Sequence, residues 1–511
     1  MPQKKYAYYV TPPELRWLWK ELGTEIQRQR ELIPLLIVRT KEDGKFYATQ
    51  FGRDFEGQIV VDPDIYGLVV DGGDPDRDMP EVWKKLSAFE TEHSMRVFRD
   101  QVLPERSFAR AYLSGAPKLA RSRTSDRATE DLILQACLMA IEHYEDLFRR
   151  FPPGLAVVVT GSSCVLGKPL TVLCRKHKVP FRNLTHSRFS HGYFWAEDEY
   201  GNAPAVSNAI VKFPDPSLTD IEKAHQEISP TGDFTHYVET LGARMRLRKL
   251  LYASAYNFAA YVYGWLKGYS RTRVTYYPNE VAKQLFRTRA QWRYLSQRKR
   301  PFLEDLPARP FVFFPLQSEP EISLGGLAPY FSNQLTTIME ISLSLPAGVL
   351  LVVKEHPVQS GVRGHAFYKS IEALPNTILI NIQQHSYPLI EKAALVVSVT
   401  SSAAHEAAAM GKKVAYFSPH GVIHAVPHVH HIASYNDLHR LAGLLTDDAD
   451  SAEQRRRDGA RYFLALRNIS VDLPKDQFNL NKVPTEDEIS VIADSLITTL
   501  NTTQTEPSPT A

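Results

Sequence analysis

The segment 396–417 constrains the fold of this chain more than any other. It reads VVSVTSSAAHEAAAMGKKVAYF, an apolar run, a turn of hydroxyl residues, an alanine-rich stretch, a glycine and a second apolar run. This order predicts a strand–helix–strand unit whose helix ends at Gly411. The start of such a helix offers backbone N–H groups to an anion. Ser401 and Ser402 are therefore candidates for binding phosphate and Glu406 for reaching a ribose, although in an ordinary unit the serines only cap the helix.

A second buried strand is predicted at 349–353, where VLLVV precedes Lys354, Glu355, His356 and Pro357. A continuous apolar run is typical of a parallel strand that is covered on both faces. Ligands of open α/β sheets bind beyond the carboxyl ends of the strands. We therefore expect Lys354 and His356 near the serine turn. Alternatively, the histidine is a strand-end residue that hydrogen-bonds to a neighbouring carbonyl.

A third strand is predicted at 311–314 (FVFF), and the loop after it contains Gln317, Glu319 and Glu321. Three strands thus deliver polar loops to one edge of a sheet. The sequence therefore predicts a single ligand-binding crevice at that edge.

The segments FPLQSEPE, VKEHP and SVTSSAAHEAAAMGKKV together resemble the C-terminal domain of bacterial capsule polysaccharide biosynthesis proteins. That family includes cytoplasmic transferases of Kdo, an acidic eight-carbon sugar that is donated by CMP-Kdo. The resemblance implies an α/β, GT-B-like fold, in which two Rossmann-like domains face a central cleft. Similar His-Pro and Ser-Ser pairs occur in bacterial polysialyltransferases, which also use a CMP-sugar. The resemblance covers residues 310–426, with a weaker similarity at 156–188.

This resemblance implies a role in donor binding for several residues. His356 and Pro357 would contact the cytidine monophosphate, with His356 near its phosphate. Ser401 and Ser402 would bind the phosphate or the sugar carboxylate, and Glu406 would hold the ribose. No metal and no cofactor are expected.

The resemblance also implies further donor-binding residues and the catalytic candidates. Gln317 and Lys354 belong to the donor-binding set, while Glu319, Glu321 and His356 are the catalytic candidates. The family has a Gln-(x)-Pro-Glu loop; this copy is one residue longer, which leaves open which glutamate faces the cleft. Kdo transfer in the family retains the β configuration, and retention in glycoside chemistry uses a carboxylate nucleophile or a shielded ion pair.

The rest of the chain predicts a second Rossmann-like half. A helix is expected over 129–151, followed by strands at 155–160 and 179–184 that flank a helix over 170–177. The predicted organisation begins with an N-terminal acceptor-side domain (1–232) and a basic helical connector (233–300). A C-terminal nucleotide-sugar domain (301–490) follows, and the chain ends with the end of a last helix and a disordered tail (491–511).

An acidic loop in the N-terminal half contains Asp71, Asp74 and Asp76, and follows an apolar run. These carboxylates either reach the acceptor or form an exposed turn rich in glycine and proline. The turn chemistry of the loop favours the exposed turn.

Composition excludes several classes of function. The net charge of +3 does not indicate nucleic-acid binding. The three cysteines lack metal-ligand spacing and fit a reducing cytoplasm, and no run of about eighteen apolar residues predicts a spanning helix. We expect a cytoplasmic protein that is at most peripheral on the inner membrane. If its acceptor is a lipid or a lipid-linked glycan, the basic aromatic stretch 287–300 is the expected contact with anionic lipid. That stretch is otherwise a solvated helix face.

Three functions remain open at this point. The first is a capsule-type glycosyltransferase that uses a CMP-sugar, with Kdo as the sugar and a glycan or lipid-linked acceptor. The second is a CDP-glycerol-type glycerophosphotransferase, although the Asp-Tyr-Ser-Ser turn of that family is replaced here by Val-Thr-Ser-Ser at 399–402. The third is a non-catalytic scaffold of a capsule assembly complex.

Overall fold

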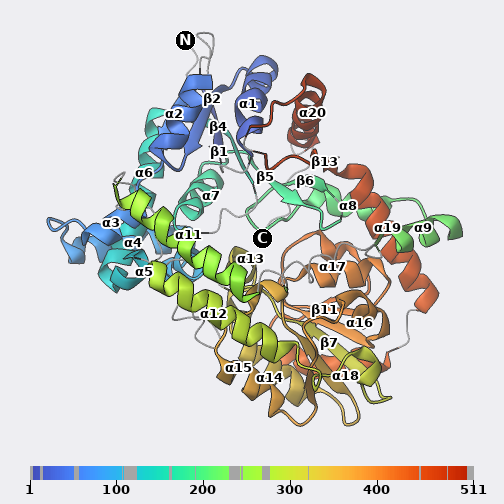
Figure 1. Cartoon of the computed structure of the whole chain (residues 1–511). Helices are drawn as coiled ribbons and strands as arrows, with labels where there is room; N and C mark the ends of the chain where they lie inside the picture. The colour runs from blue at the N-terminus through green and yellow to red at the C-terminus, as the bar shows by residue number, and fades with distance from the viewer. Residues whose placement is uncertain are drawn as a thin grey trace.

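The chain folds into two α/β halves, each built on one mainly parallel sheet, which lie one above the other in Figure 1. This computed structural model describes residues 4–11, 15–50, 57–105, 108, 123–159, 164–189, 191–228, 242, 246–266, 277–319, 321–447, 451–479 and 481–502. The predicted fold class, two Rossmann-like domains, is confirmed. Within the described ranges, no helix has both the length and the apolar character that crossing a bilayer requires.

The N-terminal sheet has seven strands in the order β13-β6-β5-β4-β1-β2-β3. These are β1 (Tyr6–Thr11), β2 (Ile33–Val38), β3 (Gln58–Val61), β4 (Pro153–Val159), β5 (Phe181–His186), β6 (Gly192–Ala196) and β13 (Val471–Asp472). The first five are mutually parallel, and β6 and β13 are antiparallel to their neighbours. From β3 through β1 to β5 the order is that of a Rossmann sheet, with its reversal between β1 and β4.

Helices cover both faces of this sheet. They are α1 (Arg16–Arg30), α2 (Lys41–Gln50), α3 (Ile65–Asp71), α4 (Met79–His93), α5 (Arg123–Arg127), α6 (Glu130–Arg150) and α7 (Gly167–Lys176). The helix predicted over 129–151 is α6, and the Thr129 side chain caps it by accepting from the Leu132 amide. The strands and helix predicted over 155–184 are β4, α7 and β5, with shifted ends; residue 160 lies outside the described residues.

The C-terminal sheet has six parallel strands in the order β12-β11-β10-β7-β8-β9. They are β7 (Phe311–Pro315), β8 (Leu350–Lys354), β9 (Thr377–Leu379), β10 (Leu395–Ser398), β11 (Val414–Tyr416) and β12 (Val429–His431). The strand order again reverses once, between β7 and β10. Ligands of such sheets bind at this reversal, beyond the carboxyl ends of the strands.

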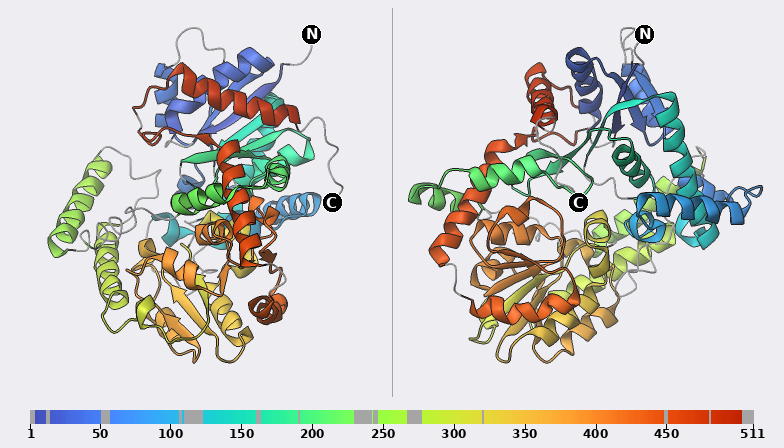
Figure 2. Two further views of the ribbon diagram at one scale, coloured as in Figure 1. Left: turned by 90° about the vertical axis from the view of Figure 1, so that its right-hand side faces the viewer. Right: turned by 180° about the vertical axis from the view of Figure 1, so that it is seen from behind.

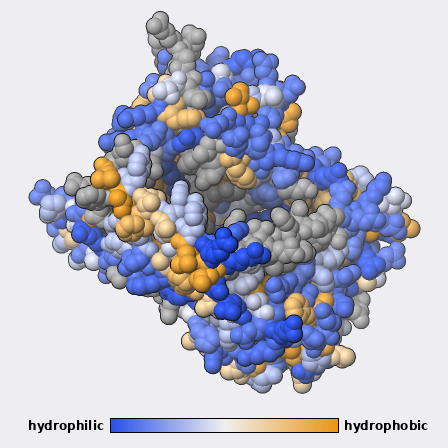
Figure 3. Space-filling model, viewed as in Figure 1, coloured by the Kyte–Doolittle hydropathy of each residue, from blue (hydrophilic) through white to orange (hydrophobic). Residues whose placement is uncertain are grey.

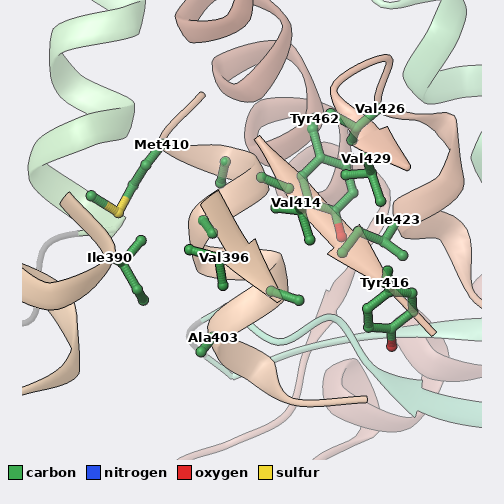
Figure 4. Packing of buried hydrophobic residues seen from close by; sticks show 14 of the residues in the cluster. Ile390, Val396, Ala403, Met410, Val414, Tyr416, Ile423, Val426, Val429 and Tyr462 are labelled. Atoms are coloured by element: carbon green, nitrogen blue, oxygen red, sulfur yellow. The ribbon is translucent and has the colours of Figure 1, made fainter. Parts of the chain in front are cut away.

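Alternate side chains of these strands enter two separate hydrophobic layers, because successive residues of a strand face opposite sides. One layer lies under α16 (Ser386–Lys392), α17 (Ser402–Ala409) and α19 (Ala452–Ile469) (Figure 4). The other lies under α12 (Pro278–Leu295), α14 (Gln334–Ser344), α15 (His365–Glu372) and α18 (Arg440–Thr446). A short helix, α13 (Ile322–Leu327), follows β7.

The helix of segment 396–417, α17, consists mostly of alanines, which allow it to pack close to its neighbours. Gly411 ends it with a φ of 73°, a left-handed conformation that glycine adopts at little cost. On α19, a Cβ at Gly459 would lie 2.5 Å from the Ala409 carbonyl oxygen, so only glycine fits there. This tight contact fixes the end of α17 against α19.

The chain returns to the N-terminal half at its end. After α19, β13 pairs with β6, and α20 (Glu486–Thr502) packs beside α1 (Figure 1). The Trp17 indole donates to the Gln477 carbonyl (2.7 Å), and α8 (Pro204–Lys212) and α9 (Leu218–Ile228) pack against α19. The two halves are therefore joined by a shared hydrophobic core as well as by the connector.

Two helices form the described part of the connector, α11 (Leu247–Leu266) and α12. Within the stretch 287–300, Trp292 belongs to the core, and buried Arg300 pairs with Glu372. Arg293 is exposed. Part of the predicted lipid contact therefore faces inward.

Candidate functional site

A cleft of about 480 Å³ lies between the two halves, at the carboxyl ends of β8 and β10. From the predicted donor-binding set it is lined by Lys354, His356, Pro357, Ser401, Ser402 and Glu406. The other lining residues include Arg188, Phe189, Glu227 and Ile228 from the N-terminal half, and His385, Ser386 and Phe463. The strand-end loops that the sequence placed at one sheet edge thus meet in one cleft of small-molecule size.

Lys354 is the last residue of β8 and is only 4% exposed. Burial lowers the pKa of its amine from 10.5 to about 8, although Glu355 beside it acts in the opposite direction. A desolvated amine of this kind gains more from a bound anion than a surface lysine does.

Two histidines of the cleft have the same orientation, set by the same interaction. His356 Nδ1 accepts from the Val358 amide (3.3 Å), and His385 Nδ1 accepts from the Tyr387 amide (3.0 Å), each at the first turn of a helix. An Nδ1 that accepts leaves the neutral ring's proton on Nε2. Desolvation lowers the pKa of both rings, so each is a neutral N–H donor at pH 7.

The start of α17 forms the opposite wall of the cleft. The Ser401 hydroxyl accepts from the Ala403 amide (3.1 Å) and caps the helix, as the alternative interpretation of the sequence held. Exposed Ser402 adjoins it. Burial raises the pKa of Glu406, which a hydrogen bond from Ser402 opposes. Because both serines and Glu406 line the cleft, capping and ligand binding are compatible.

Arg363 is a fully buried residue that the sequence analysis missed. Its guanidinium donates to Glu319 Oε1 (2.8 Å), to Glu355 Oε1 (2.5 Å) and to the Gln317 carbonyl. The pKa of Arg363 is raised: burial alone would lower it, but the two carboxylates stabilise its charge more strongly. Arg363 therefore ties the loop after β7 to the end of β8.

The same network positions His356 and the serine turn. Glu355 Oε1 accepts from the His356 amide (2.6 Å), and Glu355 Oε2 accepts from the Tyr368 hydroxyl (2.8 Å). The Gln317 side chain, with its amide oriented to satisfy both ends, accepts from the Thr400 amide (2.7 Å). Gln317 thus lies behind the serine turn and does not line the cleft.

The acidic residues that the sequence offered as catalytic or acceptor-binding candidates lie outside the cleft. Glu319 is 0% exposed and held by Arg363, and half-buried Glu321 immediately precedes α13; neither lines the cleft. Asp71 is the last residue of α3 and not part of a loop, and exposed Asp74 pairs with Arg77 (3.6 Å). These aspartates also lie outside the cleft lining.

The N-terminal half contributes an exposed cation to the cleft, Arg188. Its backbone has a φ of 74°, an uncommon value for a residue with a side chain, and its amide donates to His186 Nδ1 (2.8 Å). The neighbouring Phe189 packs edge-to-face on Phe463, with ring centroids 5.1 Å apart. A strained residue beside a cleft is a common mark of a binding site.

The cleft therefore offers Lys354, Arg188, two imidazole N–H donors and the start of a helix, all suited to an anionic ligand. Among the residues that the structure describes, no three His, Cys, Asp or Glu side chains gather as metal ligands. His424 and His428 bond to backbone carbonyls instead.

Comparison with known proteins gives no match to a family model and none to a curated protein. Among solved structures, the chain is similar to the β-Kdo 2,7-transferase of KpsC from Thermosulfurimonas dismutans, with 15% identity over 62% of this chain and 80% of that one and a TM-score of 0.29. It is also similar to UDP-GlcNAc 2-epimerase from Neisseria meningitidis bound to UDP-GlcNAc (10% identity, 97% and 100% covered, TM-score 0.29). A third is S. aureus MnaA with UDP (10% identity, 100% of both chains covered, TM-score 0.28).

Kdo transferases, the class that the three sequence segments resemble, are thus among the similar structures.

Proposed function

We propose that this chain is a GT-B glycosyltransferase that transfers Kdo from CMP-Kdo to a glycan or lipid-linked acceptor in surface polysaccharide biosynthesis. The observation that supports this most is the meeting of Lys354, His356 and the start of α17 in one cleft. Its position beside the reversal of the strand order is where nucleotides bind in Rossmann sheets.

The donor's two anionic groups match the cations of the cleft. In this proposal the phosphate of CMP accepts from His356 Nε2 and from Ser402 and the amides that begin α17. The ammonium group of Lys354 pairs with the same phosphate, and the carboxylate of Kdo pairs with Arg188 from the opposite half. Glu406 accepts from the ribose hydroxyls, and Pro357 and Ser401 shape the pocket around them.

The chemical step, in this proposal, depends mainly on stabilising the departing CMP. The bond between the anomeric carbon and the phosphate oxygen breaks, the phosphate keeps the electron pair, and His356 and Lys354 stabilise the added charge. Transfer with retention then follows an ion-pair route, in which the acceptor hydroxyl attacks from the face that CMP leaves.

In this proposal neither candidate glutamate acts on the sugar or on the acceptor. Because Glu319 is held by Arg363, we assign it the positioning of the loop after β7 and not the attack on the sugar. Glu321 immediately precedes α13, where its carbonyl accepts from the Gly325 amide (2.9 Å), and it lies outside the cleft lining. In this proposal the departing phosphate therefore receives the proton of the acceptor hydroxyl.

A nucleotide panel measured by thermal shift tests the donor. CMP at a hundred times its dissociation constant should stabilise the protein by about 2.7 kcal/mol, and UDP should not. His356→Ala should lose the CMP response, while His439→Ala, which changes an exposed histidine away from the cleft, should keep it.

Other outcomes point to the alternatives. Selective stabilisation by CDP-glycerol would support the glycerophosphotransferase. A protein that responds to no nucleotide would support the scaffold, and an equal or larger response to UDP would exclude the cytidine assignment.

A further inference from the structure

Helix α11 exposes a large apolar surface. Among the side chains of α11 that the structure describes, eight large apolar or aromatic ones are exposed, from 38% for Val262 to 74% for Tyr252; the others are Leu247, Leu251, Tyr256, Phe258, Tyr263 and Leu266. Figure 3 shows hydrophobic residues gathered where α11 and α12 lie in Figure 1. In the left view of Figure 2, α11 stands away from the body of the molecule. Contiguous exposed surface of this kind marks an interaction site.

The exposed side chains form two stripes along the helix. Leu247, Leu251, Phe258 and Val262 follow one another at spacings of four, seven and four residues, and so lie on one side. Tyr252, Tyr256 and Tyr263 form a second stripe with the same spacings of four and seven, about a third of a turn around the helix from the first. Residues of the remaining side, such as buried Leu250, face the body of the protein, where α11 packs against α12.

The Ser254 and Asn257 side chains of α11 hydrogen-bond to their own helix. The Ser254 hydroxyl donates to the Leu250 carbonyl (2.8 Å), and the Asn257 amide donates to the Ala253 carbonyl (2.7 Å). Residues 250–266 contain no charged side chain. The outward face is therefore a surface of hydrocarbon and tyrosine.

Charge at the beginning of the helix indicates what covers this face. Arg246, Arg248 and Lys249 are exposed at or immediately before the first turn of α11, and on α12 Arg293 is exposed as well. Tyrosines beside aliphatic residues, with arginine and lysine at the edge, are typical of helices that lie in the headgroup region of a bilayer. Anionic headgroups attract such a basic cluster.

We propose that α11 docks this protein on a membrane surface that contains anionic lipids. The helix lies in the plane of the interface, with Leu251, Phe258 and Val262 among the acyl chains and the tyrosines at the level of the headgroups. Arg246, Arg248 and Lys249 contact lipid phosphates. The inference does not rest on the proposed donor, because vesicle binding and nucleotide binding are measured separately.

Co-sedimentation of the full chain with vesicles tests the proposal. The protein should bind vesicles of phosphatidylcholine and phosphatidylglycerol, less so as salt rises, and bind pure phosphatidylcholine weakly. The variant with glutamine at Leu251, Phe258 and Val262 should bind at least about tenfold more weakly. Unaltered binding in that variant, or no binding by the wild type, would overturn the proposal.

Two controls separate the causes. The variant with glutamine at Val211, Leu343 and Val491, which are exposed apolar residues outside α11, should bind vesicles like the wild type. The α11 variant should keep its thermal shift with CMP, because the cleft is unchanged.

The mass in solution distinguishes a lipid from a second copy. Light scattering should give the same mass for the wild type and the α11 variant. A wild-type dimer that the α11 variant converts to a monomer would show that a second chain covers the face, and would contradict docking on lipid.

Discussion

Replacing Lys354 with methionine should make the protein more stable while weakening its binding of CMP. Lys354 is 4% exposed, and burial lowers its pKa from 10.5 to about 8. Methionine keeps the apolar stem and removes the ammonium group. Lowering the pKa from 10.5 to about 8 corresponds to about 3 kcal/mol that the charged form costs the folded state at neutral pH. The variant should recover up to this amount.

The sign of the pH dependence follows from proton binding. Between about pH 8 and 10.5 the unfolded chain keeps the lysine proton that the folded chain has released, so the wild type gains stability as the pH rises through this window. Lys354→Met lacks this gain. The free energy of unfolding should therefore differ most at pH 7, in favour of the variant, and the two proteins should converge above pH 10.5.

Urea denaturation at pH 7, 9 and 10.5 measures the difference, from the shift in midpoint at a common slope. Lys369→Met, at an exposed lysine on α15, is the matched control and should show no such window. A Lys354→Met variant that is less stable than the wild type at every pH would refute the reasoning, because the amine would then be a stabilising partner.

Four further outcomes are expected. His356→Ala should stay folded, as its exposed position allows, and lose sugar transfer; near wild-type turnover would remove it from the donor site. Arg363→Met should destabilise the protein by about 3–5 kcal/mol in urea denaturation, because it leaves two buried carboxylates without their cation, and adding Glu319→Gln should restore part of that loss. CMP affinity measured by calorimetry should fall as the pH rises above 8, since Lys354 loses its proton; a flat profile would exclude that contact. Arg188→Gln should weaken CMP-Kdo binding more than CMP binding, and equal losses would place Arg188 away from the sugar.

The parts of the fold that local patterns determine could be predicted. The apolar runs at 311–314 and 349–353 are β7 and β8, because a strand buried on both faces needs an uninterrupted apolar sequence. The small residues of α17 and the glycine at position 411 likewise predict a tightly packed helix with a sharp end. Because the strands are parallel, the polar residues that follow them meet at the carboxyl edge of the sheet.

What the sequence did not reveal depends on contacts between distant segments. Arg363 acquires its role from Glu319, which lies 44 positions away, and an isolated arginine carries no local signal of such a pairing. His385 and Arg188 enter the cleft from other loops, and β13 returns to a sheet formed mostly before residue 200. A charge run does not reveal its orientation either, which is why Arg300 was expected at the surface and is buried.

A crystal structure with CMP bound tests the central claim most directly. The account predicts the phosphate between His356 Nε2 and the first amides of α17, within hydrogen-bond distance of both, with the ribose beside Glu406. Phosphate density at another site, or at this site but with His356 turned away from it, would contradict the account.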